Sequence, residues 1–164
     1  MAYKATSDFI GSQPLDVTDT VQKHAEGFEV DGNDPVYGYG RFIYLKGVAS
    51  TAVGSLVNYD QTLHTTTLAP ATGGKGPVAV SMSANVASQW GWYQIVGAAA
   101  VKAPNAMTPG AEVFMLAATP GSVDDAAVAG EQVLNAVVST TTGTPSSGLG
   151  VIQISRPFLQ GQIT

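Results

Sequence analysis

Short runs of β-forming residues, each closed by turn-forming residues, recur along most of this chain. They are four to eight residues long, and stretches rich in Gly, Pro, Asn or Thr separate them. The runs occupy residues 41–48, 56–59, 65–68, 78–82, 90–96, 113–116, 133–138 and 151–154. Many short strands with turn residues between them are typical of antiparallel sandwiches and barrels. We therefore expect an all-β fold: a single antiparallel β-barrel or β-sandwich domain with an extended N-terminal arm.

The segments differ in how strongly their residues favour a strand, a turn or a helix. Residues 41–48 (RFIYLKGV) form the strongest predicted strand, because aromatic and β-branched side chains dominate it. A short polar run covers residues 22–30, and the cluster DGNDP at residues 31–35 predicts a turn. The sequence allows a helix only at residues 122–134, where two adjacent aspartates suit a first helical turn, and Gly130 would keep such a helix short.

A glycine stands three residues before a valine at or near the start of three predicted strands. These glycines are Gly54, Gly110 and Gly130. Glycine readily adopts positive φ, so it allows the chain to turn sharply into a sheet. The spacings of 56 and 20 residues are unequal, so the pattern predicts a recurring turn and not a repeat protein.

The first twenty residues differ from the rest, because their apolar side chains are isolated and follow neither a helical nor a strand period. We interpret residues 1–20 as the arm and residues 21–164 as the body. Deleting residues 1–19 is then expected to leave the stability of the body nearly unchanged. The alternative is a terminus that docks on nothing. The apolar residues that we expect to anchor the arm on a partner are Tyr3, Phe9, Ile10 and Leu15.

The net charge of −5 lies entirely in the first quarter of the chain. Residues 1–40 hold seven acids and two bases, whereas residues 41–164 hold five of each. Charged residues make up 12% of the chain, about half the ~25% usual for soluble proteins. We expect a body with so few charges to cover much of its surface with partners, which favours assembly over catalysis.

Several partners and compartments are disfavoured by composition. Seven basic residues scattered over 164 positions do not form the Lys/Arg patch that nucleic-acid binding needs. No apolar run approaches 18 residues, and the first ten residues lack the apolar core of a signal peptide. The chain has no cysteine, so its fold needs no disulfide. We expect no nucleic-acid partner and no membrane partner.

Residues suited to catalysis are sparse. His24 and His64 are the only histidines, and one imidazole with two nearby glutamates is a poor metal site. Asp124 and Asp125 are the only adjacent acids, and solvated loop carboxylates explain them better than an acid/base pair. No Gly-x-Ser-x-Gly motif occurs, and the glycines at residues 73–76 lack the rest of a phosphate loop. We therefore expect no enzyme activity, no metal and no cofactor.

The densest aromatic group is Trp90-Gly-Trp92-Tyr93. In a strand Trp90 and Trp92 share one face, while Tyr93 points to the other. We interpret Trp90, Trp92 and Tyr93 as core or intersubunit residues, because tryptophan anchors both settings well. The alternative is that the two indoles form a sugar-stacking platform, as in a carbohydrate-binding or adhesin-like module.

Four stretches together support a family resemblance. They are YGYGRFIYLKGVA at residues 37–49, GSLVNYD at 54–60, GPVAVSMSANVASQWGWYQI at 76–95 and RPFL at 156–159. In these stretches the chain resembles the head decoration (cement) proteins of tailed bacteriophages, and the similarity runs from about residue 21 to the end. It consists of short motifs and includes no catalytic signature.

The resemblance implies a function and partners. Decoration proteins bind the outside of an assembled capsid and lock neighbouring subunits together, often as trimers. It therefore implies a structural virion protein on the outer capsid surface, made in the host cytoplasm. Its partners would be the major capsid protein and its own copies in a homotrimer.

Overall fold

The computed structural model describes residues 4–5 and 14–161, with side chains from residue 14 onward. Its regular elements are twelve strands, and the described residues contain no helix. The strands are β1 (Lys4–Ala5), β2 (Thr18–Asp19), β3 (Glu29–Asp34), β4 (Gly38–Lys46), β5 (Leu56–Tyr59), β6 (Thr66–Leu68), β7 (Lys75–Ser81), β8 (Trp90–Lys102), β9 (Glu112–Met115), β10 (Val123–Asp124), β11 (Gln132–Thr140) and β12 (Leu149–Gln160). The expectation of an all-β domain is confirmed.

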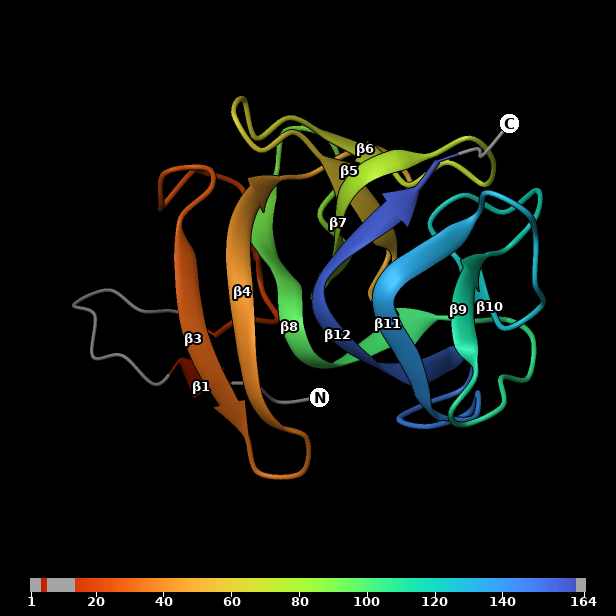
Figure 1. Ribbon diagram of the computed structural model, residues 1–164. Helices are drawn as coiled ribbons and strands as arrows, with labels where there is room; N and C mark the ends of the chain where they lie inside the picture. Colours follow the sequence, from red (N-terminus) through yellow and green to blue (C-terminus); the bar gives the residue numbers. More distant parts are fainter. Residues whose placement is uncertain (1–3, 6–13, 162–164) are drawn as a thin grey trace.

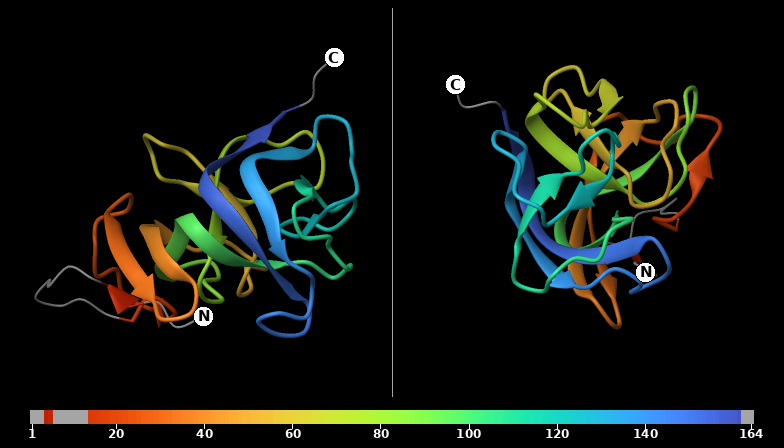
Figure 2. Two further views of the ribbon diagram at one scale, coloured as in Figure 1. Left: turned by 60° about the horizontal axis from the view of Figure 1, so that its bottom comes forward. Right: turned by 90° about the vertical axis from the view of Figure 1, so that its right-hand side faces the viewer.

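All strands belong to one antiparallel sheet with the order β1-β3-β4-β8-β7-β12-β11-β9-β10. β2 adds to β8, and β5 joins β7 to β6. Figure 1 shows β3 and β4 at one end of the molecule and β9 to β12 at the other. The two further views in Figure 2 show the sheet curling on itself, so that the body is barrel-like.

The long strand β8 makes this curl possible. Its residues 90–97 pair with β4, while its residues 96–102 pair with β12. The first residues of β7, 75–77, pair with the end of β12, and its last residues, 80–81, pair with residues 93–94 of β8. Gly97 lies where the two halves meet and has a φ of 102°, a conformation that side chains disfavour. One strand therefore belongs to both parts of the body.

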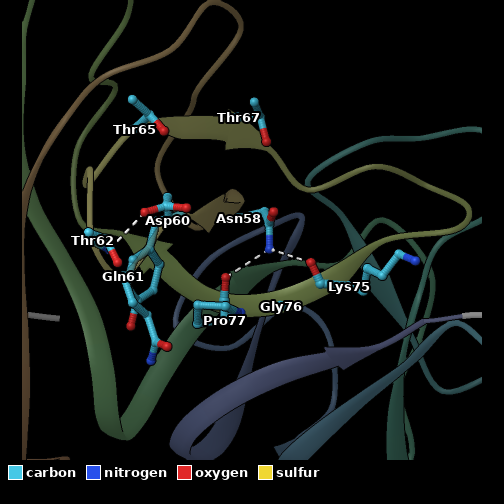
Figure 3. A pocket seen from close by; sticks show the side chains of 10 residues that line it. Asn58, Asp60, Gln61, Thr62, Thr65, Thr67, Lys75, Gly76 and Pro77 are labelled. Atoms are coloured by element: carbon cyan, nitrogen blue, oxygen red, sulfur yellow. Dashed lines mark hydrogen bonds between the residues drawn. The ribbon is translucent and has the colours of Figure 1, made fainter.

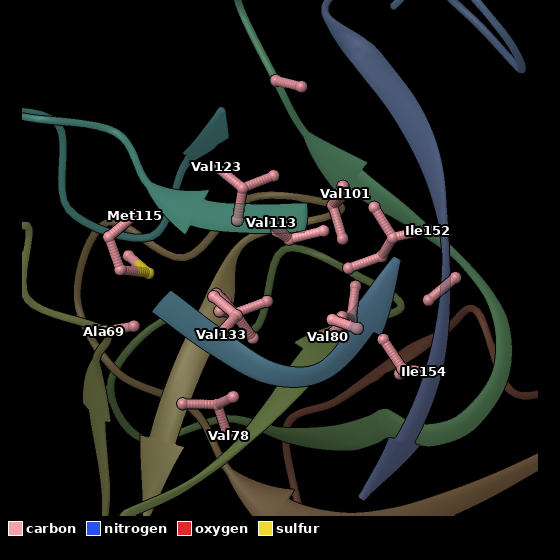
Figure 4. Close-up of a cluster of buried hydrophobic side chains, with 14 of the residues drawn as sticks. Ala69, Val78, Val80, Val101, Val113, Met115, Val123, Val133, Ile152 and Ile154 are labelled. Atoms are coloured by element: carbon pink, nitrogen blue, oxygen red, sulfur yellow. The ribbon is translucent and has the colours of Figure 1, made fainter. Parts of the chain in front are cut away.

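The largest buried cluster lies inside the curled part, as Figure 4 shows. It is built almost wholly from valine, isoleucine, leucine, alanine and methionine contributed by β5, β7, β8, β9, β11 and β12. Alternation along these strands points every second side chain inward. This interior is the main apolar core of the protein.

The β4 and β8 pair is covered on both faces. One face carries Phe42, Tyr44 and Trp92, which pack with Leu15 and other residues. The opposite face carries a second cluster that includes Ile43, Leu45 and Tyr93 and faces β5 and β7. Burial on both sides explains why residues 42–45 are continuously apolar.

The recurring glycine pattern marks one kind of turn, as predicted. Gly54, Gly110 and Gly130 have φ values of 79°, 86° and 78°. Each stands third in a four-residue turn closed by a backbone hydrogen bond of 3.0 to 3.1 Å, for example from Ala111 N–H to Thr108 O. Positive φ at the third position is typical of a type II turn.

Two local preferences of the sequence are not realised in the fold. Residues 122–134 form no helix, because Val123 and Asp124 pair with β9 and the next strand starts at Gln132. The expected turn at residues 31–35 lies partly in β3, and the real turn is closed by Asp34, whose Oδ1 accepts the N–H groups two and three residues on. In both places strand pairing outweighs the local preference of Asp and Gly.

The boundary of the arm at residue 20 also needs correction. β2 pairs Thr18 with Gly91 and Asp19 with Trp90, and Asp19 is only 3% exposed. The chain from Pro14 onward therefore belongs to the body. Among the described residues, no helix has the length and apolarity to cross a membrane.

Candidate functional site

The four candidate anchors of the arm have different outcomes. Tyr3, Phe9 and Ile10 lie outside the described residues. Leu15 is 1% exposed and packs in the cluster that contains Phe42 and Trp92. Because its side chain is already buried in its own chain, Leu15 is wrong as an anchor on a partner surface.

The aromatic group is divided between two cores. Trp90 and Trp92 share a face and Tyr93 lies on the other, as the strand period predicts. Trp92 is 2% exposed and Tyr93 is fully buried, so both are core residues. An open platform of two indoles is therefore wrong. Trp90 is half-buried, with Lys46 Nζ 5.5 Å from the centre of its ring.

His24 belongs to the same aromatic cluster. Its ring centre lies 5.7 Å from Phe28, 5.1 Å from Tyr44 and 5.2 Å from Trp92. The imidazole thus closes the outer side of the tryptophan. Within residues 14–161, no three His, Cys, Asp or Glu side chains gather as a metal site would require.

The adjacent acids at the end of β10 hold a neighbouring loop. Asp124 Oδ2 accepts a hydrogen bond from Asn105 Nδ2 at 2.6 Å, and Asp125 Oδ2 accepts the Thr108 N–H at 2.7 Å. Hydrogen bonds from the backbone and side chain of Thr108 lower the pKa of Asp125, which is half-buried. Both carboxylates accept hydrogen bonds that position residues 105–108.

A charge-poor apolar surface lies on the outer face of β11 and β12. Leu134 stands opposite Phe158, which in turn stands opposite Pro77 on β7. Val137 follows on β11, and Val137 and Phe158 are 47% and 42% exposed. β11 contains no charged residue and β12 only Arg156. We call Leu134, Val137, Phe158 and Pro77 the outer apolar row.

Ion pairs flank this row. Arg156 donates to both carboxylate oxygens of Glu29, at 3.0 and 2.7 Å, and so joins β12 to β3. Arg41 Nε donates to Asp31 Oδ1 at 2.8 Å, and this bond holds the pKa of Asp31 below its usual range. Two acids and two bases neutralise one another here, whereas Glu112 on β9, which stands opposite Val137, leaves one negative charge beside the row.

A polar hollow of about 390 Å³ opens between the β5–β6 hairpin and the start of β7 (Figure 3). Its lining is mostly amide, hydroxyl and carboxylate groups. The residues are Asn58, Tyr59, Asp60, Gln61, Thr62, Thr65, Thr67, Lys75, Gly76 and Pro77. The sequence analysis did not find this hollow, because its residues come from three strands and match no motif.

Comparison with protein-family models, with curated proteins and with solved structures finds no match to this chain. The geometry of the surfaces and the sequence resemblance are thus the basis for a functional proposal.

Proposed function

We propose that this chain is a structural virion protein that binds the outer surface of an assembled tailed-phage capsid and stabilises it by bridging major capsid subunits. The outer apolar row carries the proposal. Phe158 stands opposite Leu134, while Val137, three residues further along β11, stands opposite Gln153. Val137 and Phe158 are both exposed, and β11 contributes no charge. Leu134, Phe158 and Pro77 are neighbours across three strands, and contiguous apolar groups at the surface mark interaction sites.

The energetics suit a repeated, modest contact. Burying apolar surface contributes about 25 cal/mol per Å², and association costs several kcal/mol before any net gain. One small row therefore supports only weak binding. A shell offers many equivalent sites, and chains linked to one another in an oligomer bind several at once, which raises occupancy without tight individual contacts.

The stretches that carry the family resemblance support the proposal in two ways. Residues 37–49, 54–60 and 76–95 supply β4, β5, β7 and the first half of β8, which form the scaffold. The closing stretch at residues 156–159 contains Phe158, the largest side chain of the outer apolar row. The resemblance thus covers both the frame and part of the exposed face.

Quantitative mass spectrometry of purified virus particles tests the role directly. We expect this chain at a copy number comparable to that of the major capsid protein. Its absence from particles, or its presence at a few copies, would contradict the proposal.

The contact surface is tested by adding purified chain to capsids that lack it and pelleting the particles. We expect the double variant Val137→Ser, Phe158→Ser to lose at least tenfold in occupancy. Val36→Ser is the matched control, because Val36 is 79% exposed and lies outside the row. Equal loss in both variants would show that the row is not the contact.

A further inference from the structure

The polar hollow lies where the main core ends. Leu56 and Val78 belong to the buried cluster, and Asn58 stands opposite Val78 two residues after Leu56. Strand alternation therefore puts Asn58 on the core-facing side of β5, with Asp60 next on that side. The hollow is thus the open mouth of the barrel-like interior, a place where ligand sites are common.

The hairpin partners complete one polar face. Thr67 pairs with Asn58, and the Asp60 N–H donates to Thr65 O at 3.0 Å. Thr65 and Thr67 therefore lie across from Asp60 and Asn58, as Figure 3 shows. Two hydroxyls, an amide and a carboxylate converge on the same space.

Hydrogen bonds hold the acceptors of this face in place. Asn58 Nδ2 donates to Lys75 O at 3.2 Å and to Pro77 O at 2.9 Å, so the amide is fixed with Oδ1 as its remaining acceptor. Asp60 Oδ1 accepts the N–H groups of Thr62 and Leu63 at 2.7 and 2.6 Å, which leaves Oδ2 for a ligand. A site with fixed acceptors loses less entropy when it binds.

Gly76 lines the hollow in a backbone conformation that glycine adopts readily. It has a φ of 105°, and a Cβ built on it would lie 3.4 Å from Asn58 Nδ2. The volume of about 390 Å³ is at the small end of the roughly 300–1,000 Å³ usual for small-ligand sites.

The chemistry of the lining selects the ligand class. The carboxylate of Asp60 repels phosphate and carboxylate groups. Figure 3 shows the Lys75 side chain extending away from the hollow, so it does not offset this repulsion. A lone carboxylate with one oxygen already accepting two N–H groups is a poor cation cage. Hydroxyl groups of a ligand both donate and accept hydrogen bonds. They therefore match a lining of threonine hydroxyls, an amide oxygen and a carboxylate oxygen. We propose that the hollow binds the vicinal hydroxyls of a neutral sugar residue.

This site is independent of the proposed capsid role, since it shares only Pro77 with the outer apolar row. The test is an NMR titration of the ¹⁵N-labelled full chain with glucose, galactose or N-acetylglucosamine. The sugar is added up to about 50 mM, because a few polar contacts are expected to give a dissociation constant of about 1 mM. We expect saturable shifts confined to the amides of residues 58–67 and 75–77. No saturable shift with any of the three sugars would overturn the proposal, as would the same shifts produced by calcium chloride alone.

A double variant, Thr65→Val with Thr67→Val, removes two hydroxyls while keeping the β-branched shape. We expect it to weaken sugar binding at least tenfold. Thr141→Val is the matched control, because Thr141 is also exposed and lies outside the hollow. If the double variant changes its spectrum throughout, Thr67→Val alone carries the comparison. Undiminished binding by the variant would overturn the proposal.

Discussion

At the scale of single residues, a buried polar contact joins the N-terminal segment to the body. The Tyr44 hydroxyl donates to Asp19 Oδ2 at 2.8 Å, and Lys23 Nζ lies 2.7 Å from the other carboxylate oxygen. The Lys23 N–H donates to the same tyrosine oxygen at 3.2 Å. Tyr44 and Asp19 are 0% and 3% exposed, so water cannot replace a lost partner easily.

The substitution Tyr44→Phe should therefore destabilise the protein by about 1–3 kcal/mol, because it removes a donor from a buried carboxylate. Tyr39→Phe is the matched control: its hydroxyl donates to Asp31 at 2.7 Å, but the bond is exposed. There we expect a loss below about 1 kcal/mol. Urea denaturation of both variants measures the difference, and equal losses would contradict it.

Burial also makes stability depend on alkaline pH. It raises the pKa of Tyr44 to about 12 and that of Tyr93 to about 12. An unfolded tyrosine ionises near a pKa of about 10, so between these values the unfolded chain has lost protons that the folded chain retains. The free energy of unfolding should be steady up to about pH 10 and fall as pH rises toward 12.

Denaturant titrations across this range check the prediction, and Tyr93→Phe should fall less steeply than the natural chain. A free energy that stays level from pH 9 to pH 12 would show that neither hydroxyl is held protonated.

At the scale of elements, β8 depends on Gly97. A Cβ there would lie 2.3 Å from the backbone oxygen of Tyr39, on top of a φ that side chains disfavour. Gly97→Ala should cost about 3 kcal/mol or more, since strain and overpacking add. Gly110→Ala has a similar φ of 86° but nothing within 4 Å, so about 1–2 kcal/mol is expected. Thermal or urea unfolding separates the two, and a smaller loss at Gly97 would contradict the role of the bend.

The segment before β2 contributes to the stability of the body. Leu15→Ala should cost about 2–5 kcal/mol, because it opens a cavity beneath Trp92. Val21→Ala, at a position 73% exposed, should change stability by less than about 0.5 kcal/mol. Deleting residues 1–19 should therefore lower the melting temperature, the reverse of the expectation for a detached arm. Calorimetry of these variants is the measurement, and an unchanged transition in Leu15→Ala would restore the original view.

At the scale of the whole molecule, the distribution of charge favours self-association. Residues 41–164 are neutral in sum, and the β11 and β12 face exposes Val137 and Phe158. We expect a homotrimer in solution at high concentration, with the number three taken from the family resemblance. Sedimentation equilibrium measures the mass. A strict monomer in solution would contradict this prediction. Trimers could then form only on the capsid to which the chain is proposed to bind.

Much of the strand content was predictable from local pattern. Residues 56–59 coincide with β5, and the run at 133–138 lies within β11. The turn glycines and the division of Trp92 and Tyr93 between two faces also follow from sequence, because positive φ and strand alternation act over only a few residues.

The candidate sites were harder to predict from the sequence. The polar hollow and the outer apolar row each combine side chains from three strands, and neither has a linear motif. The two-indole platform was a reasonable pattern, yet packing against Phe42 and Leu15 buries Trp92.

The sequence by itself determined the class of fold, the three glycine turns and the charge-poor body, since composition, alternation and glycine placement are local properties. The tertiary structure alone decided which apolar residues are covered. Leu15 and Phe158 are both large apolar residues that follow a proline, but Leu15 is 1% exposed and Phe158 is 42% exposed. The reason is physical: burial depends on whether a distant strand supplies a covering surface, and only the folded chain brings β4 and β8 to Leu15 while leaving the outer face of β12 open.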